Sequence, residues 1–443
     1  MKKFTSILIL IGTILIASIH TAFANTTVNI IAISDVHFDP FQACHTTPCP
    51  TIDKLETSPI EQWDKILSET PTSKGNDSNY HILKLLINEL SYSAKKNHIG
   101  FVLMLGDFLG HHYKDKYLQY SSIKTEESYK AFALKTFRYL TVLVKKAMPD
   151  ISVYSVVGNN DTYYQHNNLS DLHEFSEELG NVWSDLIYDP DTRDSFLNQF
   201  TKAGYYAIKP REMNNVLIVG LHSTIFSLHA KGKSIDQFAN EQLDWLQETL
   251  SQAQKNQEKI LILMHIPDFI AVSSSLEKKP YQTIKFWEHN YSKRFQALLK
   301  TYDNNIIGII AGHVHNDWFH IVNHTPVISV PTGSPILNAP AYKIIIFSTI
   351  SNQFKDYQTF ILNKNNHWEM EYDFNQIYQP HCFQCRLIDG MNQVKKSGKL
   401  ADAYIKYYQL NNPGVITPKN WIYYWCNIYH HSVTGYEACL SSK

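Results

Sequence analysis

Five short apolar runs in this chain each end directly in a group of residues that can bind metal ions. These ends read Asp35-Val36-His37, Gly106-Asp107, Gly158-Asn159-Asn160-Asp161, Met264-His265 and Gly312-His313-Val314-His315. Parallel strands present their carboxyl ends at one edge of a sheet, where α/β folds place their sites. Any one of these ends has an ordinary structural explanation, but five in this order predict a single site.

The alternation of apolar runs with helical periodicity predicts an α/β fold with a layered αββα core. We expect helices over Tyr80–Asn97, Phe132–Ala147 and Phe238–Ala253, where apolar residues recur at helical spacing. The predicted strands are Val28–Ser34, Phe101–Leu105, Ser152–Val157, Val216–Leu221, Lys259–Met264, Ile306–Ala311, Val327–Val330 and Lys343–Phe347.

The residue types at the strand ends predict two metal ions rather than one. One ion is expected to bind Asp35, His37 and His315, and the other Asn159, His265 and His313. Asp107 would bridge them through its two carboxylate oxygens. Nitrogen and oxygen ligands suit Zn²⁺, with Mn²⁺ or Fe as alternatives, and the lack of thiolates argues against a closed structural zinc site. Two ions would clamp a phosphoryl group and activate a water molecule for attack on phosphorus.

These motifs resemble those of the calcineurin-like metallophosphoesterases over roughly residues 28–350. More narrowly, Asp35-Val36-His37-Phe38-Asp39-Pro40, Gly106-Asp107-Phe108 with the following His111, and the cysteine-rich tail resemble the acid sphingomyelinase-like phosphodiesterases and their endopolyphosphatase relatives. The resemblance implies a four-layer αββα metallophosphoesterase sandwich. It also implies binuclear zinc and hydrolysis of phosphodiester or phosphoanhydride bonds.

The chain departs from this family at Asn160, where the usual loop has a histidine that assists the leaving group. An amide donates a hydrogen bond but gives up no proton, so general acid catalysis from this position is lost. We therefore expect His111 to act as the acid and His166 to be a second candidate near the substrate. His222 ends a strand and is a further candidate for substrate contact. Aromatic residues that could either stack on a substrate or pack in the core are Trp287, Trp318 and Phe319.

The N-terminus has the charged, apolar and small-residue zones of a signal peptide over residues 1–24, with a retained membrane anchor as the alternative. Export would place the six cysteines in an oxidising compartment. Their grouping predicts local disulfides, although Cys382-x-x-Cys385 could also be a redox dithiol or half a zinc site. The expected pairs are Cys44 with Cys49, Cys382 with Cys385 and Cys426 with Cys439. We expect a catalytic domain over residues 25–364 and a mostly helical, disulfide-stapled C-terminal domain over residues 365–443.

The charge composition and the position of Asp35 in the chain limit the class of substrate that we expect. Lys and Arg number 40 against 41 Asp and Glu, so the net charge of -1 gives no bias toward a nucleic-acid duplex. Asp35 follows the expected cleavage site too closely for a lipid-extracting domain to precede it, so soluble nucleotides or related phosphoesters are favoured over sphingomyelin. The prediction is a secreted or periplasmic monomer without a transmembrane segment. The alternatives are an endopolyphosphatase and a metal-bound pseudoenzyme that binds phosphorylated ligands without turnover.

Overall fold

The computed structural model describes residues 26–71, 75–382, 385–410 and 412–442. The predicted signal peptide lies outside the described residues. Within the described part of the chain, no helix has the length and hydrophobicity to cross a membrane.

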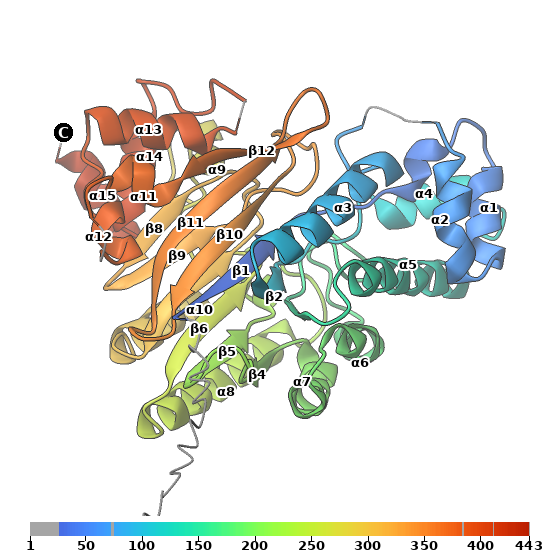
Figure 1. Ribbon diagram of the computed structural model, residues 1–443, viewed down its shortest axis with the longest axis horizontal. Coiled ribbons are helices and arrows are strands. Elements are labelled where there is room, and N and C mark those ends of the chain that lie inside the picture. Colours follow the sequence, from blue (N-terminus) through green and yellow to red (C-terminus); the bar gives the residue numbers. More distant parts are fainter. Residues whose placement is uncertain (1–25, 72–74, 383–384, 411, 443) are drawn as a thin grey trace, which may run out of the picture.

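Two six-stranded sheets form the centre of the protein (Figure 1). The first has the order β12-β11-β10-β1-β2-β3, in which β1, β2 and β3 are parallel and the others antiparallel. Its strands are β1 (Thr27–Ile33), β2 (Ile99–Met104), β3 (Ser152–Ser155), β10 (Ala341–Ser348), β11 (Gln353–Leu362) and β12 (Trp368–Asp373).

The second sheet has the order β4-β5-β6-β7-β9-β8, with a parallel centre and an antiparallel strand at each edge. Its strands are β4 (Tyr206–Ile208), β5 (Val216–Gly220), β6 (Lys259–Met264), β7 (Ile306–Ala311), β8 (Phe319–Val322) and β9 (Thr325–Ser329). The central strands are buried almost throughout, which explains why they read as continuous apolar runs rather than alternating ones.

Helices cover both sides of the paired sheets. The helices that precede β8 are α1 (Pro50–Thr57), α2 (Trp63–Ser68), α3 (Tyr80–Lys96), α4 (Tyr113–Tyr120), α5 (Glu126–Ala147), α6 (Leu172–Trp183), α7 (Pro190–Ala203), α8 (Ile235–Lys255), α9 (Val272–Glu277) and α10 (His289–Thr301). Figure 1 shows α1, α2 and α4 gathered at one end of the molecule.

The C-terminal region adds strand β12 to the first sheet before it becomes helical. Its helices are α11 (Phe374–Tyr378), α12 (Leu387–Met391), α13 (Lys399–Tyr408), α14 (Trp421–Tyr429) and α15 (Val433–Ser441). They lie together at the end of the sheets opposite α1 and α2 (Figure 1). The disulfide between Cys426 and Cys439 ties α14 to α15, and the other two also join the neighbouring cysteines expected from the sequence. The domain boundary at residues 364 and 365 stays a prediction.

All eight strands predicted from the sequence form, as β1, β2, β3, β5, β6, β7, β9 and β10. The αββα architecture is therefore confirmed. The sequence did not indicate β4, β8, β11 and β12. The helix predicted from Phe132 begins earlier, at Glu126, because the side chain of Thr125 caps it by accepting from the backbone N–H of Ser128.

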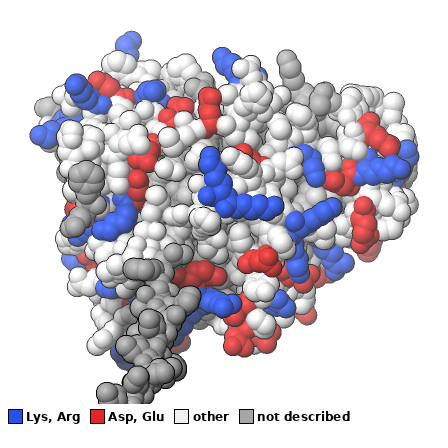
Figure 2. All heavy atoms as spheres, viewed as in Figure 1, with Lys and Arg blue, Asp and Glu red and all other residues white. Residues whose placement is uncertain are grey.

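The surface carries both signs of charge. On the face shown in Figure 2, Lys and Arg side chains are interspersed with Asp and Glu. This mixture agrees with the near-zero net charge, and on that face no large area has a single sign.

Candidate metal centre

The two sheets meet where their parallel strands end. Just beyond β1, the carbonyl of Ser34 accepts from the backbone N–H of Gly333 at 2.7 Å, and that of Asp35 accepts from the Thr332 hydroxyl at 3.0 Å. Thr332 and Gly333 follow β9 of the other sheet. Two further contacts join the loops after β1 and β2 to those after β7 and β6: the backbone N–H of His313 donates to Oδ2 of Asp35 at 3.1 Å, and Nδ1 of His265 lies 2.6 Å from the carbonyl of Leu105. All five groups predicted from the sequence therefore lie at one junction.

The backbone at this junction is strained. Five of the seven predicted metal ligands have a positive φ although none is glycine: Asp35 (55°), His37 (45°), Asp107 (55°), His313 (71°) and His315 (65°). Such conformations are uncommon outside glycine and cost about 1–3 kcal/mol each. Strain of this kind concentrates at functional sites, where the surrounding structure maintains it.

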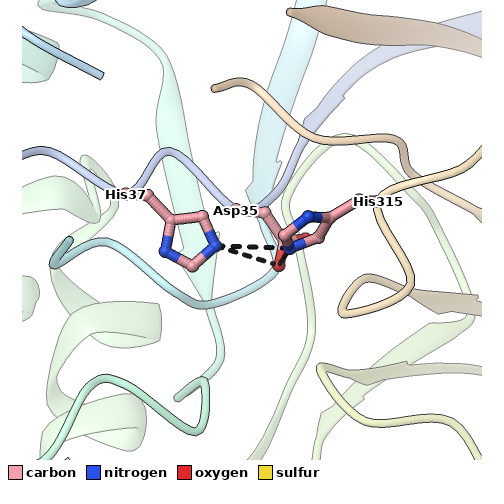
Figure 3. Close-up of side chains that lie close together, drawn as sticks. All are labelled: Asp35, His37 and His315. Atoms are coloured by element: carbon pink, nitrogen blue, oxygen red, sulfur yellow. Dashed lines mark hydrogen bonds and ion pairs between the residues drawn. The ribbon is translucent and has the colours of Figure 1, made fainter. Parts of the chain in front are cut away.

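Asp35, His37 and His315 form the first cluster, and their side chains point toward one another (Figure 3). The Nε2 atoms of the two histidines lie 3.3 Å apart, and Nε2 of His315 lies 3.0 Å from Oδ1 of Asp35. His37 has its Nδ1 atom 3.2 Å from the carbonyl of Leu109, which fixes Nδ1 as the N–H donor. Its Nε2 atom therefore carries a lone pair that faces the other two groups.

Asp107, Asn159 and His265 form the second cluster. Nε2 of His265 lies 3.1 Å from Oδ1 of Asn159 and 3.4 Å from Oδ2 of Asp107. Since Nδ1 of His265 lies 2.6 Å from the carbonyl of Leu105, this nitrogen is an N–H donor and Nε2 is the nitrogen that faces Asn159 and Asp107. The ring of His313 is 5.1 Å from that of His265.

Asp107 lies between the clusters. Its Oδ2 atom is 3.7 Å from Nε2 of His37 and 3.4 Å from Nε2 of His265. The buried Oδ1 atom of Asp35 faces Nε2 of His315 at 3.0 Å and Nε2 of His37 at 3.7 Å. Buried imidazole nitrogens and carboxylate oxygens that converge at these distances fit a pair of cations, and histidines whose other nitrogen donates to a backbone carbonyl are typical of metal ligands. The residues present therefore fit a dimetal centre.

The electrostatics of the site also favour bound positive charge. Burial lowers the pKa of His37 to about 4 and that of His313 to about 3, so both imidazoles are neutral at pH 7, the form that binds metals. Burial also acts to lower the pKa of His265, but the facing carboxylate of Asp107 outweighs it and raises this pKa to about 9. A cation placed beside Asp107 is therefore stabilised.

Asp161 orients the loop that carries Asp107. Its carboxylate accepts backbone N–H bonds from Asp107 at 2.7 Å, Phe108 at 2.7 Å and Gly158 at 2.9 Å. Gly158 is required here, because a Cβ atom would lie 2.2 Å from the backbone nitrogen of Asp107. The sequence marks Asp161 only as part of the third strand end and gives no sign of this supporting role.

Asn160 is turned inward onto Asp107. Its backbone N–H donates to Oδ1 of Asp107 and its side-chain Nδ2 to Oδ2, both at 2.8 Å, and the residue is 2% exposed. Both donors are therefore engaged with the carboxylate.

His111 lies beside the first cluster, with its ring stacked on that of His37 at 4.2 Å. Its Nδ1 atom is 2.7 Å from Oδ1 of Asp77, and its side chain is 31% exposed. Burial acts to lower the pKa of His111, but the hydrogen bond to Asp77 outweighs it and the pKa is raised. Lys116 also reaches Asp77, at 3.2 Å. Asp77 was missed in the sequence because it follows no predicted strand.

Two other candidates lie apart from these clusters. His166 is exposed, has a φ of 47° and has its ring 4.9 Å from that of His112. His222 is completely buried, with Nδ1 3.1 Å from the carbonyl of Ala203. Burial lowers the pKa of His222 to about 4.

The chain is similar to several known proteins. A model of the calcineurin-like phosphoesterase family matches residues 28–317. The chain is 21% identical to acid sphingomyelinase-like phosphodiesterase 3b of Mus musculus, with coverage of 92% of this chain and 89% of that protein. It is also 21% identical to the cyclic GMP-AMP phosphodiesterase SMPDL3A of Homo sapiens, covering 85% of this chain and 81% of that one. Among solved structures, a dimetal phosphatase from Danio rerio is 13% identical with a TM-score of 0.44, covering 72% of this chain and 95% of that one.

Proposed function

The chain belongs to the calcineurin-like phosphoesterase family, and from this premise we propose that it is an exported binuclear phosphodiesterase acting on nucleotides or related soluble phosphoesters. Family membership makes the protein a metal-dependent phosphoester hydrolase, and the family uses a dimetal centre. The ligand roles, the metal, the substrate and the export of the protein are the parts that we propose.

The observation that carries the proposal is Asp107, whose Oδ2 atom lies between a histidine of each buried cluster. Asp35, His37 and His315 would hold one ion, and Asn159, His265 and His313 the other, with Asp107 shared between them. Imidazole and carboxylate ligands without thiolates favour zinc, and they also suit manganese and iron. When bound, the two ions supply a Lewis acid for the phosphoryl oxygens and lower the pKa of a bound water.

The other side chains either hold Asp107 in position or donate a proton to the leaving group. Asp161 and Asn160 hold Asp107 in its strained conformation, since together they bond to both its backbone and its carboxylate. We assign proton donation to the leaving oxygen to His111, because its Nδ1 atom is held by Asp77 and its partly exposed ring lies over the first cluster. His166 and His222 stay candidates for substrate contact.

Export is supported by the three disulfides, because such bonds persist in oxidising compartments and are rare in the cytosol. The substrate class is supported by the relatives. One is named as a phosphodiesterase of cyclic GMP-AMP, a soluble nucleotide.

The test is hydrolysis of methyl p-nitrophenyl phosphate by the purified protein, before and after removal of metals by a chelator. We expect activity that is lost on chelation and restored by Zn²⁺, together with about two metal ions per chain. A protein that binds two ions but hydrolyses no phosphodiester would instead be a phospholigand-binding pseudoenzyme. Faster cleavage of polyphosphate than of any nucleotide would identify an endopolyphosphatase.

A further inference from the structure

The buried side chain of Gln165 joins two of the loops that carry the candidate site. Gln165 lies in the loop after β3 and is 1% exposed. Its Nε2 atom donates to the carbonyls of Gly110 at 3.0 Å and Asn160 at 3.2 Å, and its Oε1 atom accepts the backbone N–H of Tyr113. Gly110 immediately precedes His111, and Tyr113 begins α4 two residues after it. One amide therefore holds both ends of the short segment that carries His111.

The orientation of this amide is fixed by its partners. Two of them are carbonyl oxygens, which need the N–H donors of Nε2, and the third is an N–H group, which needs Oε1 as its acceptor. Rotating the amide by a half turn would place oxygen against oxygen, so one orientation alone satisfies all three partners. Both hydrogens of Nε2 are then bonded to backbone, and Gln165 acts on the loops rather than on a substrate.

The backbone at Gln165 is strained over three successive residues. Gln165, His166 and Asn167 have φ values of 50°, 47° and 62°. Residues other than glycine adopt this left-handed conformation as isolated positions, so a run of three is held by its surroundings. The backbone of Asn167 donates to the carbonyl of Asn159 at 3.1 Å and accepts from the N–H of Lys231 at 2.8 Å. Strain that is maintained in this way concentrates at functional sites, where it fixes a required geometry.

The segment that Gln165 holds includes the residue to which we assign proton donation. Asp77 holds the ring and the backbone N–H of His111, at 2.7 and 2.9 Å, whereas Gln165 holds the backbone before and after it. Asn160 accepts from Gln165 through its carbonyl and donates to the carboxylate of Asp107 through its N–H and its side chain. Gln165 therefore connects the segment of His111 to the residue that supports Asp107.

We propose that Gln165 is a positioning residue for proton transfer: its amide sets the place of His111 relative to Asp107 and so aligns His111 with the leaving oxygen of a substrate at the metal centre. This inference rests on the proposed phosphodiesterase function and on the role assigned to His111. A misplacement of about 1 Å can lower a rate by about 100-fold. Loss of the amide should therefore slow the reaction of substrates whose leaving group needs a proton.

Two esters of thymidine 5′-phosphate test the proposal, one with methanol and one with p-nitrophenol as the leaving group. Both release thymidine 5′-phosphate, which chromatography measures in the same way. Gln165→Met keeps the length of the side chain and removes its three hydrogen bonds. We expect kcat to fall about 10- to 100-fold for the methyl ester and less than about threefold for the p-nitrophenyl ester, which leaves without a proton.

Gln199 in α7 provides the matched control. Its Nε2 atom donates to the carbonyl of Ala207 at 2.9 Å and its Oε1 atom accepts the N–H of Ala207 at 3.1 Å, so its amide also joins two backbone segments. Ala207 lies in β4, at the edge of the second sheet. Gln199→Met should leave the ratio of the two rates unchanged.

A second variant, Gln165→Gly, removes the amide and also the strain, because glycine adopts a positive φ without cost. It should fold even if Gln165→Met does not, and it should show the same dependence on the leaving group. Combined with His111→Ala, it should cause no further loss on the methyl ester. Equal losses on both esters, no loss on either, or a further loss in the double variant would show that the inference is wrong. If the unmodified protein with zinc cleaves neither ester, it is the proposed function that fails.

Discussion

The Nδ1 atom of His111 lies 2.7 Å from Oδ1 of Asp77, a residue 34 positions earlier in the chain. The same carboxylate accepts the backbone N–H of His111 at 2.9 Å, so both the ring and the backbone of the histidine are held by one side chain. This arrangement leaves Nε2 of His111 as the nitrogen that can meet a substrate. The position of a proton donor is thereby set by a loop that precedes α3.

The first prediction concerns this proton donor. His111→Ala should lower turnover by about 10²–10⁴ for substrates with alkoxide leaving groups, the usual contribution of a general acid. For p-nitrophenyl esters the loss should be small, because p-nitrophenolate leaves without a proton. Steady-state rates on paired alkyl and p-nitrophenyl phosphodiesters measure this difference. The neighbouring, exposed His112 provides the control His112→Ala, and equal losses on both substrates would mean that His111 has only a structural role.

Asp77 should act through His111 rather than on the substrate. Asp77→Asn keeps the shape of the side chain and removes the charge that holds His111, so we expect a smaller loss with the same dependence on the leaving group, about 10- to 100-fold. The double variant with His111→Ala should be no slower than His111→Ala alone. Additive losses in the double variant would show that Asp77 has a separate function.

The second prediction concerns Asp107, the ligand that we expect both metal ions to share. Asp107 lies within 4 Å of a histidine from each cluster, so Asp107→Asn should reduce the metal content from about two ions per chain to about one or fewer. Activity should fall by at least ~100-fold, because even residues that only support a ligand contribute 10- to 100-fold. Elemental analysis after gel filtration measures the metal content. Asp115→Asn, an exposed aspartate in α4, is the matched control and should keep both ions.

The variant Asn160→Ala tests how much the hydrogen bond from Asn160 to Asp107 contributes to metal binding. Asn160→Ala removes the 2.8 Å side-chain bond to Oδ2 of Asp107 and keeps the backbone bond to Oδ1. We expect zinc affinity to fall about 10- to 100-fold in titrations against a competing chelator. Asn181→Ala, in α6, serves as the control. Unchanged affinity would leave Asn160 as a residue that acts on the substrate alone.

The success of the sequence-based predictions has a physical explanation. Strands such as β6 and β7 are buried on both faces, so their apolar runs are continuous and their ends are easily located. Strand β11 alternates between buried and half-buried residues, and β4 has only three residues, so neither has a clear apolar run. Asp77 could not be predicted, because its role depends on a contact across 34 residues.

A buried ion pair that the sequence did not reveal gives the third prediction. Nζ of Lys343 in β10 lies 2.7 Å from Oδ1 of Asp317, and both side chains are completely buried. Burial lowers the pKa of Lys343 to about 8, against the opposing effect of Asp317. Lys343→Met would leave a buried, unpaired carboxylate, so the free energy of unfolding should fall by about 3–5 kcal/mol.

Urea denaturation of the single and double variants measures this effect. Lys343→Met combined with Asp317→Asn should recover much of the loss, because no unpaired charge then remains in the interior. Lys364→Met, at an exposed lysine, should change stability by less than about 0.5 kcal/mol. A double variant as unstable as the single one would mean that packing rather than charge determines the effect.

The last prediction concerns the stability of the folded protein at acidic pH. Burial, and then the nearby His431, lowers the pKa of His320 to about 3, whereas an unfolded chain has a histidine pKa near 6.5. Between these values the unfolded state binds a proton that the folded state does not, so the free energy of unfolding falls as the pH drops below about 6.5. From pH 7 to pH 5 this one residue should lower the free energy of unfolding by about 1–2 kcal/mol.

His320→Phe keeps a ring beside Phe269 and Trp318 and removes the titrating group, so the stability of this variant should decline less over that range. Comparison with His367→Phe, at an exposed histidine, removes the contributions common to every variant, including loss of metal at low pH. Parallel declines for the two variants in urea denaturation at pH 5, 6 and 7 would show that His320 is protonated in the folded protein.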